Sequence, residues 1–304
     1  MIDGRLIKGI GGLYSVATPR GTYTCGARGV FRIKDTTPLI GDYVSVEIID
    51  ETQRAGRIAR IKPRRSELAR PRVANIDCAV IVFSIVEPPI NLELLDRLLL
   101  LTAEQDLRAV ICINKTDLLP HGGSALSDIT AVYAGAGYEV LCVSAAEGSG
   151  IEELRRAVSR PADNPGAGAT SVLAGPSGVG KSSIVNKILR RDKMEIGGLS
   201  LKIGRGKHTT RHAELIEIYE NDGRASGSYI VDSPGFTSLD ISHIPHEKLA
   251  RLVKEFGGFE GMCRFKDCRH LSEPGCAVRA EVGRAIDAGR YERYVNMVPT
   301  AFGR

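Results

Sequence analysis

The order of three short motifs constrains this 304-residue chain more than any other feature. The tetrad Asn114–Asp117 has the pattern N-K-x-D, which can read a guanine base, and it precedes the phosphate-binding loop Gly175–Ser182. A D-x-x-G element, Asp232–Gly235, comes last. Domains that carry these motifs usually begin with the phosphate loop. The sequence therefore predicts a complete nucleotide site on a circularly permuted α/β domain.

The phosphate loop matches G-x-x-x-x-G-K-[ST] in full. Its glycines let backbone N–H groups close around a phosphate at the start of a helix expected over 181–190. We expect Lys181 to reach the β- and γ-phosphates and the Ser182 hydroxyl to coordinate Mg²⁺.

The tetrad indicates guanine as the base. The Asp117 carboxylate can accept hydrogen bonds from guanine N1–H and N2–H₂, and adenine offers no such pair of donors. The stem of Lys115 can lie along the base, and Asn114 can brace the neighbouring loops. A backbone N–H of Ser144 or Ala145 can read guanine O6. A polar loop after a strand is the alternative for the tetrad taken alone.

Two further segments complete the expected magnesium site. Asp232 would hold Mg²⁺ through a water, and the Gly235 amide would contact the γ-phosphate. The basic, glycine-rich segment 204–212 fits a switch I loop that orders around the γ-phosphate and Mg²⁺. In this segment Thr210 is the predicted second Mg²⁺ hydroxyl, with Thr209 in reserve.

The residue that orients the attacking water is not obvious. Many GTPases place a Gln directly after the D-x-x-G glycine, and this chain has Phe236 there, which cannot orient water. His208 in switch I, with a neutral imidazole near pH 7, is the candidate catalytic residue. A solvent-facing His in a basic loop is the alternative, and the sequence leaves both open.

The predicted GTP-binding residues are Asn114, Lys115, Thr116, Asp117, Ser144, Ala145, Gly175, Pro176, Ser177, Gly178, Val179, Gly180, Lys181, Ser182, Ser183, Thr210, Asp232 and Gly235. Three of these, Ser182, Thr210 and Asp232, are the predicted Mg²⁺ ligands.

A second cluster has the pattern Cys263-x4-Cys268-x-His270-x5-Cys276. Three thiols and one imidazole complete a tetrahedral Zn²⁺ shell without an open position, which favours one structural zinc ion per chain. A cluster without metal is the alternative. The other four cysteines, expected to be buried core thiols, are Cys25, Cys78, Cys112 and Cys142.

Residues 1 to about 70 contain short β-branched segments at 13–17, 44–49 and 57–61, separated by glycines. About five such strands suit a small closed barrel such as an OB-fold. The region is also basic, and four aromatic residues are interleaved with the cations: Tyr14, Tyr23, Phe31 and Tyr43. Two interpretations remain open, a solvated basic face over core aromatics or a platform for nucleic acid.

From about residue 72 to 238, apolar runs at 78–85, 109–113, 140–143 and 171–174 alternate with amphipathic segments at 92–104 and 151–158. Such runs are typical of parallel strands buried on both faces, and strands at 213–219 and 228–231 would complete the sheet. Each motif begins where a strand ends, as expected for ligand sites of open α/β sheets. The remaining chain predicts a helix over 247–256, the cysteine cluster, and a mostly helical stretch over 277–296 with a turn at Gly289.

The composition limits the class of protein. A net charge of +5 with 43% hydrophobic and 25% charged residues is ordinary for a globular protein, and the mild positive charge permits an RNA or phosphate partner. No apolar run approaches the length of a membrane span, and no signal-peptide pattern opens the chain. We expect a cytoplasmic protein whose cysteines are reduced or metal-bound.

With these residues in place, the chain resembles the circularly permuted bacterial GTPases of the ribosome small-subunit-dependent GTPase A group (RsgA, YjeQ or YloQ). The resemblance covers nearly the whole chain. It rests on Arg28-Gly29-x-Phe31-Arg32, Gly41-Asp42, the run 66–77, the permuted motifs and the Cys/His pattern. The family also has an apolar residue after D-x-x-G and a His before the switch I threonines, which Phe236 and His208 match.

The resemblance implies an α/β multidomain protein. Its parts would be an N-terminal OB-fold that binds RNA (1–71), a permuted P-loop GTPase domain (72–238) and a helical zinc-binding domain (239–304). It implies hydrolysis of GTP to GDP and phosphate, stimulated by the small ribosomal subunit, as a checkpoint in late assembly that binds rRNA. We expect a monomer without a membrane or DNA partner. Because the expected barrel begins near residue 1, we also expect any N-terminal RNA-binding tail to be short or absent.

Two alternatives come from other classes of protein. One is an RNA-binding assembly factor whose nucleotide site does not turn over, and the intact set of Mg²⁺ ligands argues against it. The other is an adenine-nucleotide kinase, which the N-K-x-D tetrad disfavours. In the permuted order the chain runs from Gly235 and Phe236 directly toward the C-terminal domain, so we expect switch II to tether that domain to the nucleotide.

Overall fold

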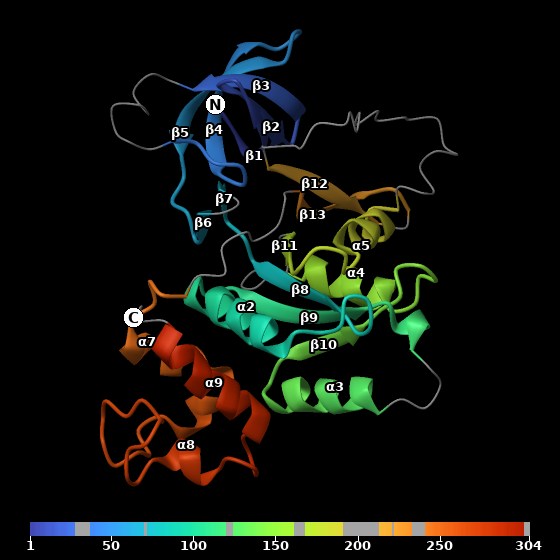
Figure 1. Cartoon of the computed structure of the whole chain (residues 1–304). Coiled ribbons are helices and arrows are strands. Elements are labelled where there is room, and N and C mark those ends of the chain that lie inside the picture. Colours follow the sequence, from blue (N-terminus) through green and yellow to red (C-terminus); the bar gives the residue numbers. More distant parts are fainter. Residues whose placement is uncertain are drawn as a thin grey trace. The chain divides into compact units, whose positions relative to one another are not determined.

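The computed structural model describes residues 1–27, 37–69, 72–119, 124–160, 168–190, 213–220, 222–232 and 241–300 (Figure 1). The chain divides into two compact units. One consists of Met1–Cys78, Arg155–Leu173 and Val185–Thr237, and the other of Ala79–Leu154, Ala174–Ile184 and Ser238–Arg304. None of the described helices combines the length and the apolar character needed to span a bilayer.

The N-terminal strands form a closed barrel, as predicted. They are β1 (Ile2–Ile10), β2 (Leu13–Thr18), β3 (Gly21–Ala27), β4 (Tyr43–Asp50) and β5 (Ala55–Ile61), in the spatial order β1-β2-β3-β5-β4. Pairing of β1 with β4 closes the barrel, and β3 and β5 run parallel. Side chains alternate between the two faces of the strands, so Tyr23, Cys25, Val44, Val46 and Ile58 fill the interior.

A buried aspartate fixes the exit of the barrel. Asp42 accepts hydrogen bonds from Arg64 at 2.7 and 2.9 Å and from the Leu39 amide at 2.7 Å. Gly41 beside it has φ +92°, and a Cβ there would lie 2.0 Å from the Ala74 carbonyl oxygen. The chain then forms the hairpin β6 (Glu67–Ala69) and β7 (Arg72–Ala74). The Gly-Asp pair is therefore required by the path of the backbone and by a buried ion pair.

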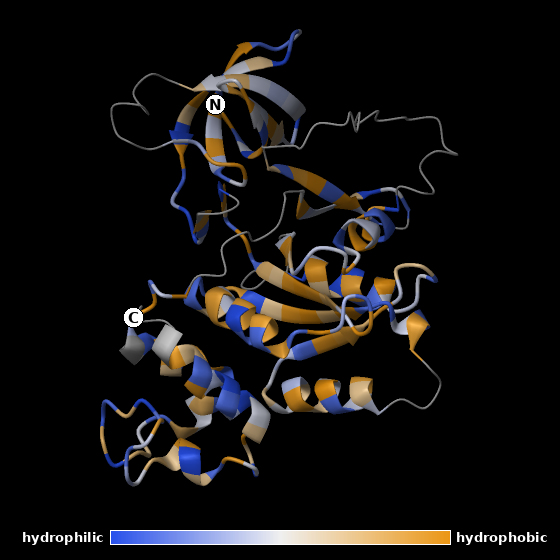
Figure 2. Cartoon of the chain, viewed as in Figure 1, coloured by the Kyte–Doolittle hydropathy of each residue, from blue (hydrophilic) through white to orange (hydrophobic). Residues whose placement is uncertain are grey.

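The second sheet has six strands in the order β10-β9-β8-β11-β13-β12. In chain order they are β8 (Cys78–Ser84), β9 (Arg108–Asn114), β10 (Glu139–Cys142), β11 (Thr170–Ala174), β12 (Glu214–Tyr219) and β13 (Ala225–Asp232). Every residue of β8 and of β11 is buried, which explains their continuous apolar runs. Figure 2 shows β8 and β9 as mostly hydrophobic. β10 runs parallel to β9 and β11 parallel to β13, whereas β12 is an antiparallel edge strand.

The helices that accompany this sheet are α2 (Leu92–Glu104), the short η1 (Thr116–Leu118), α3 (Ala125–Gly135), α4 (Ile151–Ser159) and α5 (Lys181–Ile188). α2 begins where the Asn91 side chain accepts a hydrogen bond from the Leu94 amide at 2.9 Å. α2 and α4 match the predicted segments, and α5 ends two residues before the predicted end at residue 190. The sequence pattern did not predict α3, in which Tyr133 is the one fully buried side chain among the described residues.

The C-terminal segment contains α7 (His246–Leu252), η2 (Lys254–Phe259), α8 (Ala277–Ala280) and α9 (Ala288–Thr300). Its core includes Ile244, Phe256, Tyr294 and Met297, together with Leu100 of α2. The C-terminal segment therefore shares its core with α2, one of the helices that accompany the six-stranded sheet. The predicted helix over 247–256 is divided into α7 and η2 by Val253, which has an extended backbone.

Two expectations from the sequence are wrong, the turn at Gly289 and the burial of Cys142. The turn predicted at Gly289 does not exist, because Gly289 lies in the first turn of α9, and the Asp287 side chain caps that helix by accepting from the Arg290 amide at 2.8 Å. The interruption lies over residues 281–287 instead. Cys142 is exposed because it ends the edge strand β10, whereas Cys25, Cys78 and Cys112 are buried as predicted.

Candidate nucleotide site and metal centre

The phosphate loop leaves β11 at Gly175 and enters α5 at Lys181. Gly175 has φ +139°, and a Cβ there would lie 2.1 Å from the Val82 carbonyl oxygen. Gly180 has φ +92°, and its Cβ would lie 2.3 Å from Asn114 Nδ2. The first and last glycines of the motif are thus needed for the path of the loop itself as well as for close approach to a phosphate.

Lys181 and the serines that follow it lie where the phosphate loop enters α5. Lys181 Nζ lies over the loop and donates to the carbonyl oxygens of Gly175 at 2.8 Å and Pro176 at 2.6 Å. Burial lowers the pKa of the Lys181 ammonium. Ser182 and Ser183 are exposed at the start of α5, where a hydroxyl can reach a metal ion on the phosphates.

Asn114 joins the base-reading tetrad to the phosphate loop. It is the last residue of β9 and is 2% exposed. Its Nδ2 donates to the Val179 carbonyl oxygen at 2.8 Å, and its Oδ1 accepts from the Ala145 amide at 3.1 Å. One side chain therefore connects three motifs that are separate in the sequence.

The next residues of the tetrad present the base-reading groups. Lys115 adopts a left-handed backbone with φ +63° and donates from Nζ to the Glu87 carbonyl oxygen. Asp117 lies in η1 with its carboxylate exposed. The Ser144 amide donates to the Ser149 carbonyl oxygen at 3.0 Å, and the Ala145 amide donates to Asn114. If the Ser144 or the Ala145 amide reads guanine O6, it must share its hydrogen with the acceptor that it already has, Ser149 or Asn114.

The loop after β8 also contacts the site, and the sequence motifs did not reveal it. Glu87 receives the Lys115 side chain, and Pro88 Cδ lies 3.6 Å from the position of a Cβ on Gly178. Ser84 at the end of β8 accepts from the Glu87 amide at 3.2 Å and shapes the turn. In the sequence, only the position of this loop after a strand could have indicated that it contacts the site, because ligands of open α/β sheets bind beyond the carboxyl ends of the strands.

Several predicted residues lie outside the described part of the chain. These are Thr210, Thr209, His208, Gly235 and Phe236. Asp232 is the last residue of β13, and its side chain is also outside the described part. The predictions for switch I and for the D-x-x-G glycine therefore rest on the sequence and stay predictions.

The Cys/His cluster is assembled as predicted. One ligand atom from each of Cys263, Cys268, His270 and Cys276 lies within 4.8 Å of all the others. His270 Nδ1 is 3.6 Å from Cys263 Sγ and 3.3 Å from Cys276 Sγ. Tetrahedral zinc with ordinary bond lengths places a sulfur and a nitrogen ligand about 3.6 Å apart. The residues therefore fit a four-coordinate metal ion.

The surroundings lower the pKa of Cys263 and of His270, whereas burial and the neighbouring thiols raise the pKa of Cys268 to about 12. Burial alone would raise the pKa of the Cys263 thiol, but hydrogen bonds from the backbone of Ala277 and Val278 lower it overall. Burial lowers the pKa of His270, which favours the neutral ring that a metal needs. The Tyr291 hydroxyl donates to the His270 carbonyl oxygen at 2.8 Å and holds the loop.

A buried ionic cluster attaches α9 to α2 and α3. Asp96 of α2 accepts from Arg290, from Arg293 at 2.5 Å and from the Tyr133 hydroxyl at 2.8 Å. Arg290 also binds Glu255 of η2 through two nitrogens, at 2.5 and 3.0 Å. Burial opposes the charge of Arg290, but the bonds to Glu255 and the charge of Asp96 raise its pKa above the ordinary value.

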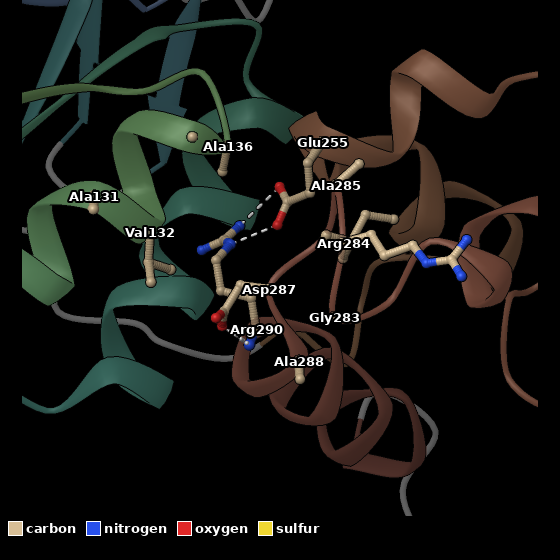
Figure 3. Close-up of a pocket in the computed structure, with 12 residues that line it drawn as sticks. Ala131, Val132, Ala136, Glu255, Gly283, Arg284, Ala285, Asp287, Ala288 and Arg290 are labelled. Atoms are coloured by element: carbon tan, nitrogen blue, oxygen red, sulfur yellow. Dashed lines mark hydrogen bonds and ion pairs between the residues drawn. The ribbon is translucent and has the colours of Figure 1, made fainter.

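A cavity of about 400 Å³ lies beside this ionic cluster (Figure 3). It is lined by residues of α3 and its C-cap, of η2, of the turn before α9 and of the start of α9: Ala131, Val132, Gly135, Ala136, Glu255, Gly283, Arg284, Ala285, Ile286, Asp287, Ala288 and Arg290. Figure 3 shows Arg290 pointing to Glu255 and Arg284 pointing away from both. No base- or phosphate-reading residue lines it, and its buried charges neutralise each other. The cavity is therefore not a candidate nucleotide site.

The described residues of the basic N-terminal region differ in burial, and their exposure alone does not decide between the two interpretations. Tyr23 belongs to the core, where it is 1% exposed and donates to Glu51 at 2.9 Å. Arg64 is used by Asp42, and Arg65 pairs with Asp77 at 2.9 Å. Other cations of this region, namely Arg54, Arg57, Arg60 and Arg72, are exposed. Tyr23, Arg64 and Arg65 thus serve the fold, while other cations of this region stay exposed.

Comparisons with known proteins agree with this geometry. The family model described as RsgA GTPase matches residues 61–242, and the model described as RsgA N-terminal domain matches residues 3–58. The small ribosomal subunit biogenesis GTPase RsgA of Alkaliphilus metalliredigens is 42% identical over 300 residues, which cover 98% of this chain and 97% of that protein. The protein of the same name from Clostridium perfringens is 40% identical over 304 residues, covering 100% of this chain and 99% of the relative.

Two solved structures share the fold over nearly the whole chain. The crystal structure of YjeQ from Thermotoga maritima matches with a TM-score of 0.82 and 32% identity, covering 100% of this chain and 99% of the other. The crystal structure of YloQ, described as a circularly permuted GTPase, matches with a TM-score of 0.78 and 33% identity, covering 98% and 94%.

Proposed function

The chain belongs to the RsgA family of circularly permuted GTPases and is a GTP hydrolase, and we propose that it acts in the biogenesis of the small ribosomal subunit. In this proposal the subunit stimulates hydrolysis, and the protein binds rRNA as a late assembly checkpoint. The protein is a cytoplasmic monomer with neither DNA nor a membrane as its partner. Its three parts are 1–71, 72–238 and 239–304.

The main support for a nucleotide site is the pair of hydrogen bonds that the Asn114 side chain makes. Its bonds to Val179 and to Ala145 hold the phosphate loop and the base-reading loops in one arrangement. A nucleotide that binds both loops finds them already connected, which lowers the cost of ordering them. Asp117, exposed on η1, supplies the carboxylate that selects guanine.

The chain's own residues divide the work on GTP. The phosphate-loop amides and Lys181 bind the β- and γ-phosphates and offset their charge. Ser182, Thr210 and Asp232 would hold Mg²⁺, which would neutralise charge that develops on the phosphate oxygens. The Gly235 amide contacts the γ-phosphate, and His208 positions the water. Zinc, held by Cys263, Cys268, His270 and Cys276, stabilises the C-terminal fold.

The test is a multiple-turnover phosphate-release assay with and without purified small ribosomal subunits. We expect the subunits to raise turnover; no stimulation would contradict the checkpoint role and favour a factor whose nucleotide is structural. The variant Asp117→Asn should weaken GTP binding by a factor on the order of 10², because a carboxylate that accepts two hydrogen bonds is lost. The same variant should bind xanthosine triphosphate better than the wild type does, since the amide can donate to the 2-oxo group.

A further inference from the structure

Barrel strand β1 carries two cations that contact the hairpin β12–β13. Lys8 Nζ lies 2.6 Å from Glu214 Oε2, with the two side chains 45% and 21% exposed. Arg5, which is buried, places its guanidinium 5.2 Å from the centre of the Tyr229 ring and 4.9 Å from that of Tyr43. All of these residues belong to the same compact unit.

Arg5 anchors the barrel to the hairpin. Its guanidinium stands over one aromatic ring from β4 and one from β13, and it donates to the Asn75 carbonyl oxygen at 3.1 Å. Nε makes no hydrogen bond among the described residues, so the two rings provide much of its stabilisation. The Tyr229 hydroxyl is in turn hydrogen-bonded to Glu217 of β12, its partner across the hairpin.

Lys8 contacts the hairpin at the end where β12 begins and β13 ends at Asp232. In the register of β12 and β13, Glu214 lies opposite Asp232. Residues opposite each other in an antiparallel pair have Cα atoms about 4.5–5.5 Å apart, so a shift of one is transmitted to the other. Glu214 is also the first residue of β12, directly after the segment expected to form switch I.

We propose that Lys8 is a positioning residue for the magnesium site, acting through its ion pair with Glu214 on the strand end that presents Asp232. This inference rests on the proposed function, in which Asp232 holds Mg²⁺. Magnesium demands near-ideal octahedral geometry, and Asp232 would hold one of its water ligands, so a small displacement of the Asp232 backbone would misplace that water and weaken binding of the ion. Through Arg5 and Lys8, the barrel sets where the metal-binding end of β13 lies.

The ion pair makes the inference easy to test without unfolding the protein. An exposed ion pair contributes little to global stability, so Lys8→Met should fold normally. We expect the Mg²⁺ concentration that half-saturates GTP hydrolysis to rise by a factor of about two to five. Lys8→Glu should raise it further, because it places a like charge against Glu214. The double variant Lys8→Glu with Glu214→Lys should return the requirement toward that of the wild type.

The matched control is Arg224→Met. Arg224 forms an ion pair with Asp222 at 2.7 Å at the turn of the same hairpin, away from Asp232. It should leave the Mg²⁺ requirement unchanged. The assays use the full chain at saturating GTP, with GDP affinity measured separately to show that the base and phosphate loops are intact. Rescue by charge reversal is a result that general destabilisation would not give.

Two results would overturn the inference. One is an unchanged Mg²⁺ requirement in both Lys8 variants, and the other is an equal change in Arg224→Met. Asp232→Asn separates the inference from the proposed function. If Asp232→Asn raises the Mg²⁺ requirement and the Lys8 variants do not, the inference alone fails. If Asp232→Asn has no effect, the magnesium assignment fails and the inference fails with it.

Discussion

Asp96 of α2 and Arg290 of α9 form a buried ion pair across 194 positions of the sequence. Arg290 is also held by Glu255, and Arg293 binds the second oxygen of Asp96. This pair fastens the metal-binding segment to the helix that follows β8. The C-terminal segment is therefore attached to α2 by side chains, in addition to the chain connection after β13.

Removing Asp96 should be costly. Asp96→Ala leaves the charge of Arg290 without one of its two partners, and breaking one side of a buried pair costs about 3–5 kcal/mol. Urea denaturation of the metal-bound protein would measure this loss. Glu93→Ala is the control on the same helix, because its exposed pair with Arg97 contributes about 0–1 kcal/mol. Equal losses in the two variants would contradict the role of the pair.

Replacing Asn114 should uncouple the phosphate loop from the base-reading loops. Asn114→Ala leaves the Val179 carbonyl and the Ala145 amide without their partner, at about 1–3 kcal/mol for each buried group. We expect GDP and GTP affinity to fall by a factor on the order of 10 to 10², measured by equilibrium titration. Asn91→Ala removes only the cap of α2, and should lower stability by about 1 kcal/mol with unchanged affinity.

Loss of zinc should unfold the C-terminal segment and leave guanine binding in place. The ligand segment 263–276 contains no helix or strand, so the metal should supply much of its folding free energy. Chelation or Cys268→Ser should release one zinc per chain and lower helical circular dichroism, while GDP still binds. Cys142→Ser, at an exposed cysteine outside the cluster, should retain the metal. Loss of GDP binding together with zinc would show that the two parts are not separable.

His208→Ala should reduce turnover while GTP affinity is kept. Removing a group that positions or activates the attacking water typically lowers the rate by about 10²–10⁴. Single-turnover hydrolysis with small subunits present isolates this step from product release. His243→Ala is the control, because its side chain is exposed and pairs with Glu104 of α2. An unchanged single-turnover rate in His208→Ala would remove this residue from the mechanism.

The fold could be predicted where local patterns are strong. Residues 78–83 are all apolar and residues 172–174 continue this pattern, because both faces of β8 and β11 are buried, and the motifs follow strands as the sheet requires. The tetrad, the phosphate loop and the Cys/His cluster have fixed spacings that arise from their chemistry. α3 escaped prediction because little of it is buried, and Cys142 because its strand is at the edge of the sheet.

Contacts between distant residues had no signal in the sequence. Nothing in the residue types of Asn114 and Val179, or of Asp96 and Arg290, shows that they meet. The same holds for Lys8 and Glu214, which form an ion pair, and only the register of β12 and β13 shows that Glu214 lies opposite Asp232. Such pairs depend on how elements pack, which a linear pattern does not contain.

Because α9 is fastened to α2, any coupling between a metal ion in the Cys/His cluster and a guanine nucleotide would pass through Asp96. α2 follows the loop that receives Lys115, and α9 closes the segment that carries the metal ligands, so both ligands stabilise elements joined at Asp96. Any factor by which zinc tightens GDP binding must equal the factor by which GDP tightens zinc binding. The factor is small if GDP still binds after zinc is lost, and its size is the same whichever ligand is removed first.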